Sequence, residues 1–168
     1  MALIHTAKLG YRILASKYVN MVVYVDPQGI EQEIDFADLV KTSTYTVLYF
    51  YPKDNTPGCT IEAKDFTELQ PDFAKYKTQI IWVSKDSVKS HCGFQNKQWL
   101  TLGLISDTDT TLAQQFDARG EKKFMGRKYM GMFRNTYLLD KKGTIIYKRE
   151  NVSAAWHAKN VLEYIQSL

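Results

Sequence analysis

The residues that are the clearest candidates for catalysis are the four from Thr56 to Cys59, with the sequence Thr-Pro-Gly-Cys. They follow an apolar run, 47–51, that predicts a buried strand, and they precede a stretch, 60–76, with apolar residues at helical spacing. Cys59 is therefore expected at the N-terminus of a helix. Because unpaired N–H groups and the helix dipole favour negative charge there, the position favours a thiolate, the nucleophilic form of cysteine.

Length and composition limit the class of protein. The chain has 168 residues, two cysteines and a formal net charge of +4. This length fits one domain, expected to cover residues 1–168. Cys59 and Cys92 form no Cys-x-x-Cys pair, so no metal site is predicted, and no cofactor is expected. No apolar run reaches the ~20 residues that span a bilayer. The mild, scattered positive charge does not indicate a nucleic acid or a membrane as partner.

The first 25 residues carry Lys8, Arg12 and Lys17 but no acidic residue. Two interpretations stay open, an ordinary first helix or arm and an amphipathic organelle presequence. The segment has neither a continuous apolar core nor a small-residue cleavage pattern, which argues against secretion. We therefore expect a cytoplasmic protein with free or redox-active thiols.

The rest of the chain predicts a mixed α/β sheet with helices on both faces. Strands are expected at 21–26, 30–34, 45–51, 79–84, 102–106, 135–140 and 144–150, the first two and the last two as hairpins. Helices are expected at 35–40, 60–76, 86–99, 110–117 and 153–168, with a Gly- and Lys-rich loop at 118–132. Pro71 is expected to break or kink its helix. Since crossovers bring helix N-termini to the carboxyl edge of parallel strands, both thiols are expected at that edge.

Smaller predictions concern caps and core residues. Asp35 is expected to cap the first helix, and Asp86 or Ser87 the third. The last helix is expected to bury Trp156, Val161, Leu162 and Ile165 as its apolar stripe, and Trp82 and Trp99 are expected in the core.

The junction around Cys59 points to peroxide chemistry. Thioredoxin-like redox proteins place a Cys-x-x-Cys pair at such a junction, but Thr56 stands at the first cysteine position here. A single activated thiol suits peroxide reduction, in which the thiolate attacks one oxygen, the other leaves and a sulfenic acid remains. The developing charge needs donors, for which the Cys59 N–H, the Thr56 hydroxyl and a cation are candidates. Pro52 and Pro57 stiffen the loop.

Residues 49–60, Tyr-Phe-Tyr-Pro-Lys-Asp-Asn-Thr-Pro-Gly-Cys-Thr, resemble the active-site segment of peroxiredoxins, whose pattern is P-x-x-x-T-x-x-C. Within this family, the segment is similar to the bacterioferritin-comigratory, or Q-type, branch. Three further segments also resemble that branch: 83–91, 120–127 and 134–140. The match runs from about Val22 to the C-terminus and leaves residues 1–20 outside as an N-terminal extension. It implies a thioredoxin fold, with a central mixed sheet flanked by helices and an N-terminal β-hairpin.

The resemblance also implies reduction of hydrogen peroxide and alkyl hydroperoxides, with roles for individual residues. Cys59 is implied to be the peroxidatic thiol, Thr56 to hydrogen-bond the thiolate and the peroxide, and Pro52 to shield the pocket. Arg134 is implied to favour the thiolate and to hold the peroxide oxygens. Thioredoxin or a similar thiol is the implied reductant, and a monomer is the expected state. Further candidates for contact with substrate are Gly58 and, along an apolar entry, Phe50, Phe124 and Met125.

Two routes could regenerate the Cys59 thiol, one through a second cysteine of this chain and one through an external thiol. Many members of this branch carry a resolving cysteine five residues after the first, where Lys64 stands here. Another subgroup places it near Gln95, and Cys92 lies about one helical turn before that position. A Cys59–Cys92 disulfide needs Cα atoms within about 7 Å, hence local unwinding, which Gly93 would ease. Otherwise an external thiol is required.

Alternatives remain for the function and for several residues. The chain could be a thioredoxin-like disulfide oxidoreductase, which Thr56 disfavours, or a non-catalytic thioredoxin-fold binding module. Cys92 could be an inert helix thiol. Glu62, in the first turn after Cys59, either complements the helix dipole or orients Arg134. His91 and His157 are expected to be bystanders.

Overall fold

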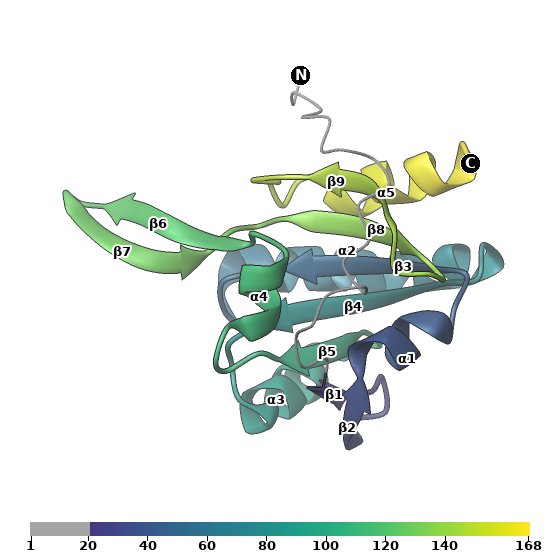
Figure 1. The fold of residues 1–168 in the computed structure, drawn as a ribbon, viewed down its shortest axis with the longest axis horizontal. Coiled ribbons are helices and arrows are strands. Elements are labelled where there is room, and N and C mark those ends of the chain that lie inside the picture. Colours follow the sequence, from purple (N-terminus) through teal and green to yellow (C-terminus); the bar gives the residue numbers. More distant parts are fainter. Residues whose placement is uncertain (1–20) are drawn as a thin grey trace.

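The computed structural model describes residues 21–168 (Figure 1). The predictions for residues 1–20 lie outside this range. The strands are β1 (Met21–Val25), β2 (Glu31–Asp35), β3 (Tyr45–Phe50), β4 (Thr78–Ser84), β5 (Gly103–Ser106), β6 (Arg119–Phe124), β7 (Arg127–Met132), β8 (Thr136–Asp140) and β9 (Ile145–Arg149). The helices are α1 (Phe36–Lys41), α2 (Pro57–Lys75), α3 (Val88–Gln98), α4 (Thr111–Gln115) and α5 (His157–Gln166). Within the described range, no helix is long and apolar enough to cross a membrane.

Seven strands form one mixed sheet in the order β2-β1-β5-β4-β3-β8-β9. The three central strands, β3, β4 and β5, run parallel, while β1 and β8 flank them in the antiparallel direction. The carboxyl ends of β3 and β4 therefore meet at one edge of the sheet, the edge from which the β6–β7 hairpin extends (Figure 1). The predicted mixed sheet and its two hairpins, β1–β2 and β8–β9, are confirmed.

The side chains of β3 alternate between two cores, one on each face of the sheet. Val47 and Tyr49, and Tyr51 directly after the strand, pack with α2, α3 and α5 on one face. Leu48 and Phe50 pack with α1 and α4 on the other face. Burial on both faces explains why this strand is apolar at nearly every position rather than at every second one.

Helix starts follow local sequence signals. The Asp35 side chain accepts hydrogen bonds from the first turn of α1, and Ser87 accepts one from the first turn of α3, so both predicted caps are confirmed. Helix α2 begins at Pro57, three residues before the predicted start, because proline suits the first helical position. Of the two predicted effects of Pro71, a break or a kink, the break is wrong, since the helix continues to Lys75. Phe66 and Phe73, both fully buried, anchor it on either side of the proline.

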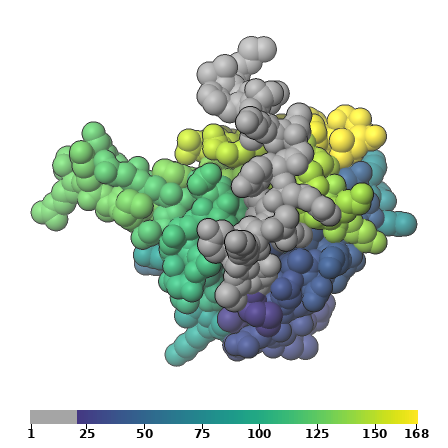
Figure 2. Space-filling view, in the orientation of Figure 1, coloured from purple at the N-terminus to yellow at the C-terminus, as the bar shows by residue number. Residues whose placement is uncertain are grey.

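The predicted loop at 118–132 is instead the β6–β7 hairpin, in which Phe124 pairs with Arg127. Met125 and Gly126 both have positive φ, 49° and 77°, as a two-residue type I′ turn requires. Figures 1 and 2 show that the hairpin projects from the body of the molecule. Most of its side chains are exposed on both faces. The sequence therefore has no apolar alternation that would indicate a strand.

Two tryptophans and the start of the last helix differ from prediction. Helix α5 begins at His157, and Trp156 precedes it with 70% of its surface exposed instead of joining the apolar stripe. Trp99 directly follows α3 and is 86% exposed, so its predicted core position is wrong, whereas Trp82 is fully buried as predicted. Both exposed tryptophans have left-handed backbones at helix ends, which periodicity cannot distinguish from a helical turn. The other three residues of the stripe are buried as predicted: Val161, Leu162 and Ile165.

Candidate active site

Cys59 is the third residue of α2, just beyond the carboxyl end of β3, and its side chain is fully buried. The predicted strand–loop–helix junction is therefore confirmed. Thr56 occupies the N-cap position by its backbone, but its side chain makes no capping hydrogen bond. Its hydroxyl donates to the Lys53 carbonyl at 3.0 Å. Because that hydrogen is engaged, the hydroxyl offers its oxygen as an acceptor.

Arg134 lies in the connection between β7 and β8 and reaches the first turn of α2. A Cβ atom placed on Gly58 would lie 3.3 Å from the Arg134 Nη2 atom. The Nη1 atom donates to the Tyr49 hydroxyl at 3.4 Å and to the Glu62 carboxylate at 3.3 Å. Burial would lower the pKa of Arg134, but the Tyr49 hydrogen bond and the charges of Cys59 and Glu62 raise it above its ordinary value. The guanidinium therefore stays charged beside Cys59.

Glu62 is a fully buried carboxylate that joins Arg134 to the last helix. One oxygen pairs with Arg134, and the other lies 3.2 Å from Nδ1 of His157. His157 Nε2 is 2.6 Å from the Thr136 hydroxyl. The expectation that Glu62 contacts and orients Arg134 is supported, and the expectation that His157 is a bystander is wrong. His157 is 95 residues from Glu62 in the chain, so no local signal could have found it.

A second buried pair holds the loop that leads to Cys59. Asp54 Oδ2 is 2.8 Å from Nδ1 of His91 and accepts a hydrogen bond from the Ser90 hydroxyl at 2.8 Å. His91 Nε2 faces the Ile105 carbonyl at 3.0 Å. Both ring nitrogens of His91 therefore have a polar partner in the buried interior. His91 is therefore not a bystander, since it ties the β3–α2 loop to α3.

Pro52 is half-buried and lines a cavity of about 170 Å³ beside the base of the β6–β7 hairpin. Lys122 of β6 lines the same cavity. Burial and then the charge of Arg134 lower the pKa of Lys122, while the charge of Cys59 opposes that shift. Lys122 is thus a further cation near the thiol, which the sequence alone did not single out.

The predicted apolar entry is not formed by the expected residues. Phe124 and Met125 lie at the tip of the hairpin, 68% and 87% exposed, away from the cavity. Phe50 is fully buried and packs against Phe116 and Tyr137. It points to the face of the sheet opposite Cys59, because successive residues of β3 alternate between faces.

Cys92 does not lie beside Cys59. Its Sγ atom is 3.9 Å from the Gly29 carbonyl oxygen, in the turn between β1 and β2. Because β1 runs antiparallel to β5, this turn lies toward the amino ends of the parallel strands, and β5 and β4 separate β1 from β3. The expected meeting of the two thiols at the carboxyl edge is therefore not found. Both cysteines are free thiols.

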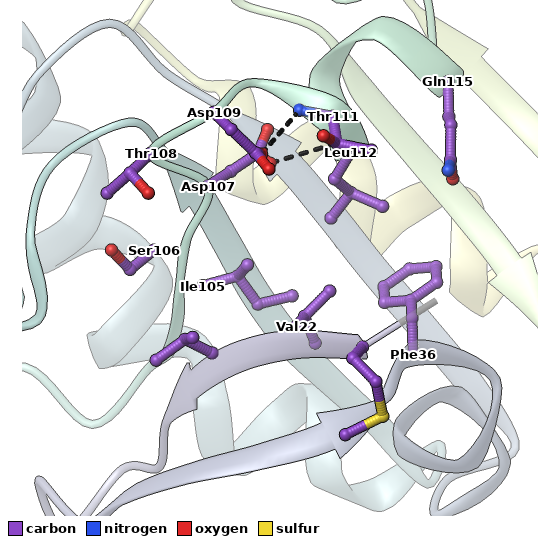
Figure 3. A pocket seen from close by; sticks show the side chains of 12 residues that line it. Val22, Phe36, Ile105, Ser106, Asp107, Thr108, Asp109, Thr111, Leu112 and Gln115 are labelled. Atoms are coloured by element: carbon purple, nitrogen blue, oxygen red, sulfur yellow. Dashed lines mark hydrogen bonds between the residues drawn. The ribbon is translucent and has the colours of Figure 1, made fainter. Parts of the chain in front are cut away.

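A separate pocket of about 200 Å³ lies between β1, β5 and α4 (Figure 3). Its carboxylates are engaged by the start of α4: Asp107 accepts from the N–H of Leu112 at 3.0 Å, and Asp109 from that of Thr111 at 3.0 Å. None of the predicted site residues lines this pocket. The convergence of a thiol with charged side chains is found around Cys59.

Comparisons with known proteins show the family of the chain. Residues 22–148 match the model of the AhpC/TSA family. The chain is 43% identical over 123 residues to Peroxiredoxin Bcp of Xanthomonas campestris pv. campestris, covering 73% of this chain and 77% of that protein. It is 40% identical over 143 residues to Peroxiredoxin Bcp of Bacillus subtilis, covering 83% and 91%.

Solved structures show the same architecture. The bacterioferritin comigratory protein of Xanthomonas campestris, studied for its alkyl peroxide reduction activity, superposes with a TM-score of 0.82 at 34% identity, covering 96% of this chain and 97% of that one. A mutant PrxQ of Xylella fastidiosa gives a TM-score of 0.84 at 31% identity, covering 95% and 96%. The mixed α/β fold is thus the thioredoxin-like fold predicted from the sequence. The chain belongs to the AhpC/TSA family and, within it, to the peroxiredoxins of the bacterioferritin-comigratory, or Q-type, branch.

Proposed function

We propose that this peroxiredoxin reduces hydrogen peroxide and alkyl hydroperoxides with Cys59 as the peroxidatic thiol. The observation that carries the proposal is the thiol in the first turn of α2 beside an Arg134 guanidinium held by Glu62. A helix N-terminus and a fixed cation both stabilise a thiolate and the charge that develops on a leaving oxygen.

In the proposed step, the Cys59 thiolate attacks one oxygen of the hydroperoxide ROOH. An S–O bond forms as the O–O bond breaks, so sulfur loses two electrons and becomes a sulfenic acid. The alkoxide RO⁻ leaves and takes a proton from water to give ROH. Arg134 and the Cys59 N–H stabilise the oxygens, the Thr56 hydroxyl accepts from the O–H of the substrate, and Pro52 shields the site.

A thiol then regenerates Cys59. The sulfenic acid condenses with a thiol to give a disulfide and water, and a second thiol reduces that disulfide. The first thiol is Cys92 or an external one, and the final reductant is thioredoxin or a similar thiol. We further propose that residues 1–168 act as one domain in a cytoplasmic monomer, as the family resemblance implies. Light scattering after gel filtration should then give a mass near 19.4 kDa.

The direct test is consumption of hydrogen peroxide by the full chain with dithiothreitol as reductant. Cys59→Ser should abolish consumption, and dimedone should label Cys59 after one equivalent of peroxide. Cys92→Ser is the matched control, because it removes the other thiol and should keep activity with this small reductant. If the wild-type chain consumes no peroxide with any thiol donor, the proposal fails.

A further inference from the structure

We propose that the cavity beside Pro52 binds the carboxylate of hydroperoxides that carry one, so that anionic hydroperoxides are preferred substrates. The inference rests on the proposed function, because the peroxide end of such a molecule would react at Cys59. Pro52 connects the two places: it borders the cavity and belongs to the loop that leads into α2.

Three cations from two segments of the chain line the cavity. Lys85 follows β4, while Arg119 and Lys122 lie on β6, and no carboxylate is among the lining residues. Within residues 21–168, none of the three takes part in an ion pair. The Lys122 ammonium donates to the Met132 carbonyl at 3.0 Å, which fixes it at the cavity wall. The cavity therefore presents positive charge with no counter-ion from the described chain.

Holding several positive charges around one cavity is energetically unfavourable when no anion is bound. Burial and then the nearby Arg134 charge lower the pKa of Lys122, so Lys122 already experiences repulsion from one neighbouring cation. The charge of a Cys59 thiolate opposes this shift. A carboxylate bound in the cavity would offset the repulsion between the cations. Clustered charges of one sign also raise the local concentration of an oppositely charged substrate.

Size and lining favour a small molecule over a protein surface. The cavity measures about 170 Å³, whereas sites for whole drug-sized ligands begin at about 300 Å³. It therefore suits one end of a ligand. Its remaining wall is partly apolar, formed by Pro52, Tyr129, Met130 and Met132, which suits the carbon chain that links a carboxylate to a hydroperoxide.

The test measures the oxidation step alone, by stopped-flow tryptophan fluorescence of the reduced full chain. The substrates are hydroperoxycarboxylates of increasing chain length, each beside its methyl ester, with hydrogen peroxide as reference. At low salt, the best-fitting carboxylate should react about tenfold faster than its ester, at the lower end of electrostatic focusing. Added salt should reduce this ratio.

Arg119→Gln and Lys85→Gln should each bring the carboxylate-to-ester ratio toward one and leave the rate with hydrogen peroxide unchanged. Lys123→Gln is the matched control, since it removes the same charge from an exposed β6 residue that does not line the cavity. It should keep the wild-type ratio.

A ratio of one at every chain length in the wild type would overturn the proposal. So would a ratio that neither variant lowers. If the variants slow only the later reduction by a thiol protein, the cations form a docking surface for that protein and the subsite is refuted. If no hydroperoxide reacts at all, the proposed function fails. The subsite is then decided by NMR titration of Cys59→Ser protein with hexanoate, whose binding should weaken in the additional Arg119→Gln background.

Discussion

The Arg134 guanidinium is positioned by the Tyr49 hydroxyl, the Glu62 carboxylate and the backbone at Gly58. A Cβ atom on residue 58 would lie 3.3 Å from Nη2 of Arg134, which is closer than an ordinary van der Waals contact. Glycine avoids this close contact because it has no Cβ. The thiol and the cation therefore meet through the smallest residue of the Thr-Pro-Gly-Cys segment. Gly58 therefore leaves the space that the Arg134 guanidinium occupies.

Gly58→Ala should displace the guanidinium by a few tenths of an ångström and slow the reaction with hydrogen peroxide about tenfold, since small misplacements in a site are costly. Stability should hold or rise by up to ~1 kcal/mol, because alanine favours a helix over glycine. Stopped-flow oxidation and urea unfolding check the two effects. Gly93→Ala in α3 is the control, as its added Cβ has no neighbour within 4 Å. An unchanged rate in Gly58→Ala would contradict this account of Arg134.

At the scale of elements, the β3–α2 loop is fastened to α3 rather than left as a free connection. The Asp54 carboxylate meets His91, and the Asp54 N–H donates to Asp86 at 2.9 Å. The side chains of the Asp54–His91 pair are at most 1% exposed. Such a pair holds its elements together mainly because separating it leaves a buried charge without a partner.

Asp54→Asn should therefore lower the free energy of unfolding by ~3–5 kcal/mol, the range for breaking a buried ion pair from one side. Urea unfolding measures the loss. The matched control is Asp38→Asn, which removes an aspartate from the exposed pair with Lys41, and it should change stability by less than ~1 kcal/mol. Equal effects of the two substitutions would show that the loop does not depend on His91.

Across the whole molecule, the two thiols belong to helices that follow neighbouring strands but face different ways. Cys92 contacts the β1–β2 turn, and β1 lies three strand positions from β3, about 14 Å across the sheet. A disulfide requires Cα atoms within about 7 Å, so the folded arrangement must open before Cys59 and Cys92 can join. Unwinding of first helical turns is the least costly way to open it.

The sulfenic acid on Cys59 should therefore appear before any Cys59–Cys92 disulfide. After one equivalent of hydrogen peroxide, early quenching with dimedone and peptide mapping should give the same Cys59 adduct in the wild type and in Cys92→Ser. Any disulfide in the wild type should form later, together with a loss of helical circular dichroism. A disulfide that forms as fast as peroxide is consumed would contradict this order.

The sequence by itself determined the features that depend on neighbouring residues. The apolar strand β3, the caps Asp35 and Ser87 and the thiol at the start of α2 are all local patterns, and the family resemblance added Arg134. The tertiary structure alone decided the contacts between distant residues, such as Glu62 with Arg134, 72 residues apart. It also decided the β6–β7 hairpin, whose exposed faces leave no periodic pattern, and the direction in which Cys92 points. The physical reason is that propensity and capping act within a few residues, whereas buried ion pairs exist only once the sheet brings their partners together.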